Sequence, residues 1–256
     1  MELQLLMATM SKENISDLKL EEKNINIDTL IINQTDNNKI LVEGNSKMIN
    51  FNERGISKSR NRSIENAEGK ICIISDDDVI YLKDIYKTIK DSFESDPSAD
   101  IITFKIETTE GDDFKNYEYE AFYHNKKSIL RVSSIEVAFK LDSIISKGIK
   151  FDENFGLGST YISGEENIFL MDCINKGMKI KFIPITIGIH KKETSGRILN
   201  EKAIYSKGAL FYRLFGIKCT YLNLGFILKK INMIKFNKVK AIYMIYKGSL
   251  DYIFKK

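Results

Sequence analysis

The chain has 256 residues, is 43% hydrophobic and carries a formal net charge of +4. This length and composition predict a globular protein with one large domain, or one domain with an extension. Its three cysteines, Cys72, Cys173 and Cys219, exclude a disulfide framework or a CxxC zinc site, so a reducing cytosol is the expected compartment. The first ten residues lack a basic leader with a long apolar core, and no secretory signal is predicted.

Strands and helices alternate in the N-terminal part of the sequence. Short apolar runs predict strands at residues 3–8, 28–33, 47–51 and 71–74, and helical spacing predicts helices at residues 11–21 and 56–66. A polar turn is expected at residues 34–38. This alternation is typical of an α/β protein with a doubly wound, mainly parallel sheet.

The second part of the sequence is less regular. A helix is predicted at residues 82–93, and Pro97 ends it. Residues 100–107 and 116–122 alternate like strands of a small antiparallel addition, with a turn at residues 111–113. Weak helical character follows at residues 134–146, then a loop at 151–163, a helix at 164–176 and a strand at 179–189.

Three consecutive aspartates, Asp76, Asp77 and Asp78, follow the most hydrophobic of the predicted strands. Such a strand is covered on both faces of a parallel sheet, and its carboxyl end lies at the edge where ligands bind. Adjacent carboxylates repel one another, and a divalent cation shared with a phosphate would cancel this repulsion. The alternative is that the acids are solvated and one of them caps the following helix.

A second acidic pair, Glu165 and Glu166, begins the helix predicted after the loop at residues 151–163. Ser163 and Glu166 have the spacing of a capping box, which would occupy that carboxylate with a backbone N–H group. A carboxylate held at a helix start beside a glycine-rich loop could instead serve as a general base. Both interpretations remain open from these residues.

Together, these features resemble the family 2 glycosyltransferases with the GT-A fold. The resemblance depends on the alternating α/β half, the acids at residues 76–78, the basic segment at residues 54–61 and the Gly164-Glu165-Glu166 sequence. It covers about residues 2 to 190 and leaves the C-terminal tail outside. What it implies about the site is therefore an expectation for that region alone.

The resemblance implies a role for particular residues. Asp76 and Asp78 would bind Mn²⁺ or Mg²⁺ bridging the donor diphosphate, His190 could complete the metal shell or be structural, and Glu166 or Glu165 would be the base. The expected donor-binding residues are Thr9, Asn33, Gln34, Asp36, Arg54, Ser57, Arg60, Asn61, Asp76 and Asp77. The Arg60 region could equally be a solvated basic helix face.

Two positions depart from the family pattern. The family has Glu-Asp where this chain has Glu165-Glu166, so which of the two is the base stays open. At the end of the second strand the family has acidic residues, whereas this chain has Asn33 and Gln34 before Asp36. Amides can hydrogen-bond a nucleobase, so nucleotide binding is expected while the identity of the base is open.

The implied activity is metal-dependent, inverting transfer of a sugar to a hydroxyl of a saccharide or lipid-linked saccharide, in the synthesis of a surface polysaccharide. A UDP-sugar is the expected donor. Two other interpretations remain: a non-catalytic relative that binds a sugar nucleotide, and a nucleotidyltransferase, although no glycine-rich phosphate loop lies near the first strand. Nucleic-acid binding is not expected, because the tail lysines are spread among apolar residues.

The tail concentrates the positive charge. Residues 202–256 contain twelve Lys or Arg and one acid, Asp251, and these residues predict a helical, basic and amphipathic extension of a catalytic domain at residues 1–200. That domain would divide into a nucleotide-sugar half, about 1–98, and an acceptor half, about 99–200. No uncharged apolar run in the tail approaches the roughly 20 residues that span a bilayer. The helices could lie on the anionic inner face of the plasma membrane, cover the catalytic domain or form a homodimer.

Overall fold

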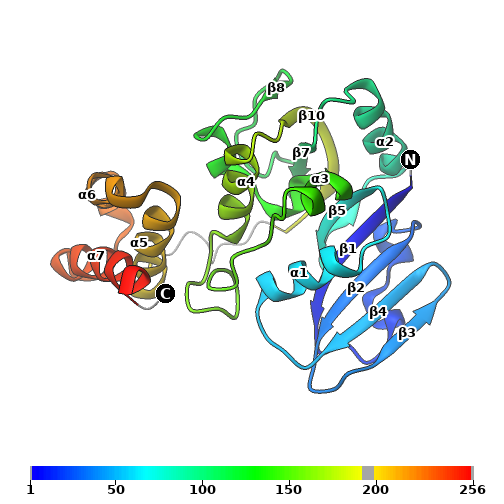
Figure 1. Ribbon diagram of the computed structural model, residues 1–256, viewed down its shortest axis with the longest axis horizontal. Helices are drawn as coiled ribbons and strands as arrows, with labels where there is room; N and C mark the ends of the chain where they lie inside the picture. The colour runs from blue at the N-terminus through cyan, green and yellow to red at the C-terminus, as the bar shows by residue number, and fades with distance from the viewer. Residues whose placement is uncertain (1, 192–198, 255–256) are drawn as a thin grey trace. The chain divides into compact units, whose positions relative to one another are not determined.

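The computed structural model describes residues 2–191 and 199–254 (Figure 1). Its strands are β1 (Leu3–Met10), β2 (Thr29–Gln34), β3 (Ile40–Glu43), β4 (Ser46–Phe51), β5 (Ile71–Asp76), β6 (Ile80–Tyr81), β7 (Ile101–Glu107), β8 (Phe122–Tyr123), β9 (Val137–Lys140) and β10 (Ile180–Ile189). Its α-helices are α1 (Ile56–Asn66), α2 (Ile85–Ser95), α3 (Leu141–Ser146), α4 (Glu165–Asn175), α5 (Glu201–Phe215), α6 (Cys219–Lys230) and α7 (Lys238–Phe254). The mixed α/β class and the helical tail are confirmed.

The described residues form one ten-stranded sheet whose main path runs β3-β4-β2-β1-β5-β9-β7-β10-β6. Strands β4, β2, β1 and β5 pair in parallel, as do β7 and β10, whereas β9 is antiparallel to β5 and β7. Strands β3, β6 and β8 are antiparallel additions. The predicted parallel sheet with antiparallel additions is therefore confirmed, and the carboxyl ends of the parallel strands share one edge.

The chain divides into two compact units. Among the described residues, the first unit comprises 2–54, 58–151 and 169–191, and the second comprises 55–57, 152–168 and 199–254. The whole sheet belongs to the first unit, and the three helices α5, α6 and α7 belong to the second. The carboxyl edge of the sheet therefore belongs to the first unit.

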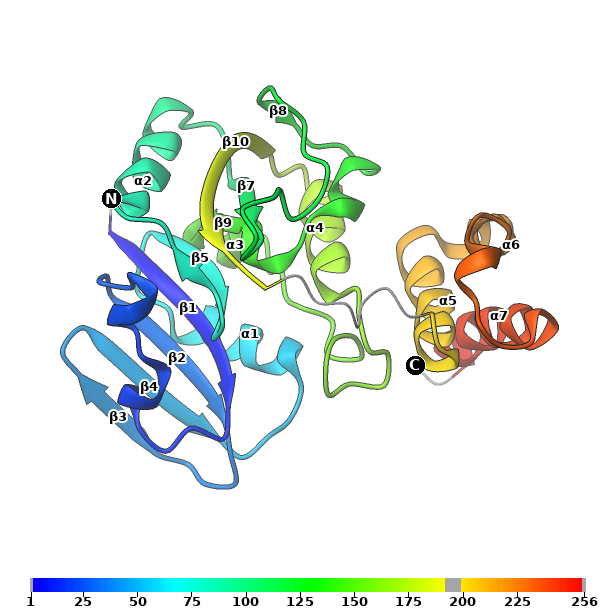
Figure 2. The same ribbon diagram turned by 180° about the vertical axis from the view of Figure 1, so that it is seen from behind.

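Both faces of the sheet are covered in the first unit. On one face, apolar residues of the central strands pack with Ile85, Ile89 and Phe93 of α2 and with short 3₁₀ segments between β1 and β2, which lie in front of the strands in Figure 2. On the other face, the Phe151 ring stacks on Phe169 of α4, with ring centroids 4.2 Å apart. This double burial explains why the strands are continuous apolar runs.

Three local predictions were wrong. Residues 11–21 form no α-helix but contain the 3₁₀ segments η1 (Ile15–Leu18) and η2 (Glu21–Lys23), separated at Lys19, whose left-handed backbone has a φ of 51°. The Asp17 carboxylate accepts hydrogen bonds from the Asn14 and Glu13 amides, and such local bonds compete with helix formation.

The other two errors concern strands. The strand predicted at residues 100–107 is β7, and the turn predicted at residues 111–113 is present, where Glu107 and Asp113 form an isolated antiparallel bridge. The strand predicted at residues 116–122 was wrong: only Phe122 and Tyr123 form a strand, which pairs with β10, while β7 pairs with β9 and β10. Residues 134–146, predicted as helical, contain β9 before the short helix α3. Strand β9 has four residues and lies between two longer strands, so pairing decided its structure over local propensity.

The second unit is held together by a close approach of α5 and α7. A Cβ added to Gly208 of α5 would lie 1.8 Å from the Ile245 carbonyl oxygen, and one added to Gly248 of α7 would lie 1.9 Å from the Tyr205 carbonyl oxygen. The two backbones touch at these glycines, so no larger residue fits without separating the helices.

We expect Gly208→Ala to lower the free energy of unfolding by about 2 kcal/mol, because the added methyl group overpacks this crossing. Gly225→Ala in α6 is the matched control, since nothing lies within 4 Å of its added Cβ. The control should raise stability by about 0.5–1 kcal/mol through helix propensity. Urea denaturation followed by circular dichroism measures both, and equal effects of the two substitutions would contradict the close crossing.

Candidate functional site

Polar residues from four parallel strands meet at the carboxyl edge of the sheet in the first unit. Thr9 of β1 pairs in register with Asn33 of β2, which pairs with Asn50 of β4, while Ala8 pairs with Asp76 at the end of β5. The strand order places these side chains beside one another, as expected for the ligand-binding edge of an open α/β sheet. We call the acids Asp76, Asp77 and Asp78, with the side chains that contact them, the strand-end cluster.

Asp76 contacts a buried arginine. The Arg60 guanidinium lies 3.2 Å from the Asp76 carboxylate, donates to the Ser134 hydroxyl at 2.8 Å and lies over the Phe151 ring at 5.6 Å. Arg60 is only 5% exposed. A buried guanidinium needs an anion, and Asp76 supplies it. At Arg60, α1 therefore faces the sheet edge and is not a solvated basic surface.

Asp77 is held by groups from β1 and the segment after it. The Thr9 hydroxyl donates to the Asp77 carboxylate at 2.5 Å, and the Lys12 ammonium lies 3.7 Å from the same oxygen. The Lys23 ammonium donates to the Asp77 carbonyl at 2.6 Å. Burial lowers the pKa of Lys23, and the charge of Asp77 opposes that shift. These contacts leave two ammonium groups beside the acids.

Asp78 pairs with the histidine that ends β10. The imidazole Nε2 of His190 lies 3.1 Å from the Asp78 carboxylate, and this hydrogen bond lowers the pKa of Asp78. His190 is 8% exposed, its amide donates to the Glu107 carbonyl, and Phe114 packs edge-on against its ring at 5.7 Å. The structure therefore brings His190 to Asp78 across 112 residues of sequence.

The donor set at Asp78 and His190 fits a divalent cation that is shared with a substrate. Within residues 2–191 and 199–254, no group of three or more His, Cys, Asp or Glu side chains is arranged to hold a metal ion. Mg²⁺ and Mn²⁺ sites commonly use one or two protein carboxylates and complete the shell with phosphate oxygens and water. A carboxylate and an imidazole supply part of such a shell and no closed cage.

The other predicted donor residues differ in exposure. Asn33 is fully buried and donates both amide hydrogens internally, to the Lys12 carbonyl and the Asn50 side chain. Gln34 is also buried. Asp36 and Arg54 form an exposed ion pair of 2.6 Å. The Asn33 amide thus shapes the strand ends, whereas the Asp36 and Arg54 pair is open to solvent.

Two further predicted residues make bonds to the backbone. The Asn61 amide forms two hydrogen bonds with the Phe151 backbone and is buried, so it fixes the chain within the first unit. In the second unit, the buried Ser57 hydroxyl donates to the Phe155 carbonyl at 2.6 Å. These contacts are structural, and each joins a side chain to the backbone of its own unit.

The acidic pair Glu165 and Glu166 lies in the second unit at the start of α4. Glu165 is 8% exposed and Glu166 is half-buried, and the Glu165 carboxyl carbon would lie 3.1 Å from a Cβ added to Gly156. Lys207 of α5 lies near both acids: burial lowers its pKa, and the charges of Glu166 and Glu165 oppose the shift. The charges of the pair thus act on the Lys207 ammonium.

Sequence reasoning missed Lys12, Lys23, Ser134 and Lys207. Lys12 lies two residues beyond β1, so the rule that strand ends carry ligand-binding groups could have found it. Lys23, Ser134 and Lys207 reach their partners from other elements, and no local pattern marks them.

The comparisons with known proteins show the fold. No family model matches the sequence, and no curated protein sequence matches it. Among solved structures, S. aureus TarS matches with a TM-score of 0.58 at 13% identity, over 99% of this chain and 44% of that chain. The chain thus spans less than half of the longer TarS chain.

The shorter TarS 1–349 is matched along almost its whole length. Its complex with UDP gives a TM-score of 0.60 at 12% identity, over 100% of this chain and 92% of that chain. Its complex with UDP-GlcNAc gives 0.61 at 13% identity, over 100% and 93%. These likenesses show that the chain shares the fold of TarS, in agreement with the predicted mainly parallel α/β architecture. Membership of family 2 stays a prediction.

We expect the Arg60 and Asp76 pair to show a coupling free energy of about 1–3 kcal/mol in a double-mutant cycle of Arg60→Met and Asp76→Asn, because the guanidinium is desolvated. The matched control is the exposed Arg54 and Asp36 pair, with Arg54→Met and Asp36→Asn, for which about 0–0.5 kcal/mol is expected. Urea denaturation measures both cycles. Similar couplings for the two pairs would show that burial at Arg60 does not strengthen its ion pair.

Proposed function

We propose that this protein is a glycosyltransferase that uses a nucleotide-sugar donor. The observation that carries the proposal is the strand-end cluster: three carboxylates, a histidine and three cationic side chains at the carboxyl edge of a sheet. The fold is shared with TarS, whose structures were solved with UDP and with UDP-GlcNAc. Proteins commonly bind a diphosphate through cationic side chains and a divalent metal ion held by carboxylates. The cluster contains cationic side chains and candidate metal ligands.

The donor is proposed to be a UDP-sugar bound at this edge. Lys12, Lys23 and Arg60 supply positive charge for the diphosphate, while Asp78 and His190 would hold Mn²⁺ or Mg²⁺. When bound, the ion would neutralise charge that develops on the departing nucleotide. Gln34 ends β2, Asp36 follows it, and Arg54 forms an ion pair with Asp36, so these three residues are the proposed contacts of the nucleoside.

The general base is proposed to be Glu166. A base must reach an acceptor hydroxyl, and Glu166 is more exposed than Glu165. Its carboxylate takes the hydroxyl proton as the acceptor oxygen forms a bond to the anomeric carbon, and the bond from that carbon to the diphosphate oxygen breaks on the opposite face. The products are an inverted glycoside, the nucleoside diphosphate and a protonated Glu166. The positive charge of Lys207 would help to hold this carboxylate.

The full chain should bind UDP-GlcNAc in the presence of Mn²⁺. Without an added acceptor, it should transfer the sugar slowly to water, and this transfer is measured as the release of UDP. Asp78→Asn should weaken UDP-GlcNAc binding at least tenfold. Glu166→Gln should leave binding unchanged and lower UDP release by about 10²- to 10⁴-fold, the usual contribution of a general base. Calorimetry and a UDP-release assay measure these effects.

Asp142→Asn, on the exposed side of α3, is the matched control for the loss of a carboxylate and should change neither quantity. Binding without UDP release, from any nucleotide sugar tested, would favour a non-catalytic relative. Absence of binding to every nucleotide sugar would refute the proposal.

The second unit has an outward-facing apolar stripe on α6 and the turns beside it. Ile217, Tyr221, Leu224, Leu228 and Ile231 recur at intervals of four, three, four and three residues, and all are exposed. Ile217 and Tyr221 are each 84% exposed. The opposite side of α6 carries the buried residues Cys219, Asn223 and Ile227. The outer face of the helix is therefore apolar although it is exposed, while its other face is buried in the second unit.

A second stripe continues on α7. Val239, Tyr243, Leu250 and Phe254 are exposed, and Tyr246 of the same helix donates to the Thr220 carbonyl beside Tyr221. Exposed lysines with no ion pair among the described residues flank the stripe on α6 and the turn after it. They are Lys218, Lys229 and Lys235. No described helix is long and apolar enough to cross a bilayer.

We also propose that these stripes lie on an anionic membrane surface. Apolar side chains would enter the interface, and lysines contribute about 1 kcal/mol each near an anionic surface. This placement would bring the enzyme to a lipid-linked acceptor. A lysine-flanked apolar stripe complements anionic lipid better than a second copy of itself, whose lysines would repel.

The full chain should co-sediment with phosphatidylglycerol vesicles, less so at high salt, and not with phosphatidylcholine vesicles. Leu224→Ser with Leu228→Ser should weaken vesicle binding at least tenfold. Ile40→Ser with Val42→Ser removes two exposed apolar residues from β3 as a matched control and should have no effect. A change from dimer to monomer on the α6 substitution, without vesicle binding, would show that the stripe is a homodimer interface instead.

A further inference from the structure

A cavity of about 290 Å³ lies in the first unit, and no residue of the strand-end cluster lines it. We call it the side pocket. Thr103 of β7 and Phe182 of β10 line it from the sheet and pair directly in register. Thr103 precedes Glu107, the β7 residue that contacts His190, by four residues, which at about 3.3 Å per residue separates them by roughly 13 Å. The sheet residues of the pocket are therefore set back from the carboxyl edge.

Aromatic side chains form much of the side pocket. The rings of Tyr117 and Phe182 are parallel within 3° at 6.0 Å between centroids, and Phe122 lies 5.3 Å from Phe182. His124 packs on Phe122 at 4.8 Å. The face of an aromatic ring is partly negative and attracts the C–H groups of a sugar ring. Ligand pockets are commonly built this way, with a few fixed polar groups.

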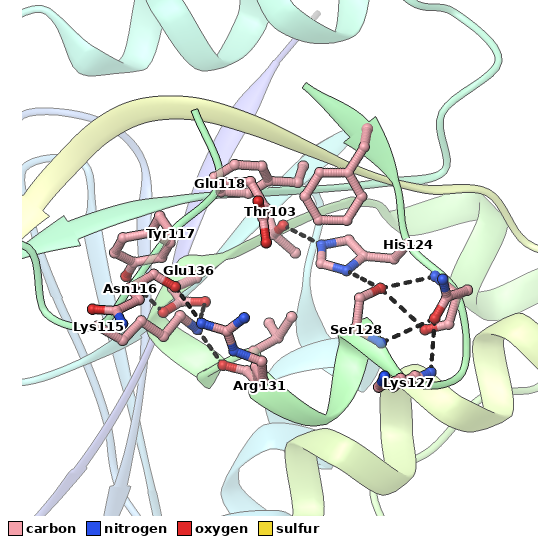
Figure 3. Close-up of a pocket in the computed structure, with 14 residues that line it drawn as sticks. Thr103, Lys115, Asn116, Tyr117, Glu118, His124, Lys127, Ser128, Arg131 and Glu136 are labelled. Atoms are coloured by element: carbon pink, nitrogen blue, oxygen red, sulfur yellow. Dashed lines mark hydrogen bonds and ion pairs between the residues drawn. The ribbon is translucent and has the colours of Figure 1, made fainter. Parts of the chain in front are cut away.

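The buried polar groups of the side pocket are held in place and balanced in charge. Figure 3 shows His124 between Thr103 and Ser128, with ring nitrogens 2.9 and 3.0 Å from their hydroxyls. Burial lowers the pKa of His124 to about 4, so the ring is neutral at pH 7. The buried Glu136 carboxylate is paired with Lys115 at 2.6 Å. The interior thus has no net charge to attract an ion.

The rim mixes hydrogen-bond donors and acceptors. It carries the exposed side chains of Asn116, Glu118, Asn125, Lys127 and Arg131, some of which are labelled in Figure 3. A sugar hydroxyl both donates and accepts, so such a mixed rim suits it better than a uniformly basic rim would. The volume is near the lower limit of about 300–1,000 Å³ for ligand pockets, which matches a single sugar ring.

We propose that the side pocket binds one neutral sugar residue of the acceptor saccharide, apart from the site of transfer. The inference rests on the proposed function and specifies its acceptor as a saccharide that contacts the enzyme at two places. Binding there would hold a longer acceptor on the enzyme, because a second contact makes the other one effectively intramolecular.

The test is saturation-transfer NMR on the full chain with cellobiose, maltose and chitobiose as neutral probes, in the presence of UDP to occupy the donor site. Phe122→Ala should weaken the binding of the responding disaccharide at least tenfold. Tyr119→Ala is the matched control, because Tyr119 is in the same segment, is 95% exposed and does not line the pocket. Both variants should keep wild-type UDP affinity, which shows that the Phe122→Ala variant is folded.

Equal disaccharide binding by the Phe122→Ala variant and the wild type, or no binding of any probe at millimolar concentration, would overturn the proposal. Equal binding of inorganic phosphate or uridine at the side pocket would also overturn it, by showing an anion or nucleoside site. Failure of the wild type to bind UDP would instead refute the proposed function. Failure of the side-pocket proposal can therefore be told apart from failure of the proposed function.

Discussion

The repulsion among three consecutive carboxylates is the constraint on which the sheet edge depends. Asp76 is stabilised by Arg60 of α1, Asp77 by Thr9 and Lys12 at the end of β1, and Asp78 by His190 at the end of β10. Each partner comes from a different segment. The acids can follow a fully buried strand only because the fold delivers these groups to one edge. Cationic side chains thus already balance much of the negative charge of the three aspartates. The sequence had suggested that a metal ion and a pyrophosphate balance it.

Part of this arrangement could be predicted from the sequence. The apolar run of β5 followed by acids predicted a strand end at the ligand-binding edge, and α1 was predicted with the bounds that the structure has. The pairing of His190 with Asp78 could not be predicted from local sequence patterns, because 112 residues separate the two. The segment after β1 was mistaken for a helix because Asp17 bonds locally to the backbone, and β9 was missed because its partners, and not its four residues, determine it.

The fold is shared with TarS at 12–13% identity, and the apolar pattern of the strands gives a physical reason. Continuous apolar strands covered on both faces can be built from many sequences, so the framework survives when the residues change. The residues at the strand ends are less interchangeable. Asn33 uses both amide hydrogens inside the fold, whereas the Asp36 and Arg54 pair is open to solvent.

The hydrogen bond from Arg60 to Ser134 has a mechanical consequence. Ser134 and Glu136 belong to one short 3₁₀ turn, η4 (Ser134–Glu136), and Glu136 forms part of the side pocket. An incoming anion that drew the guanidinium away from Ser134 would shift the turn that carries the pocket carboxylate. Binding at the sheet edge would then change binding at the side pocket through this three-residue turn. Thermodynamic linkage requires the effect to be mutual.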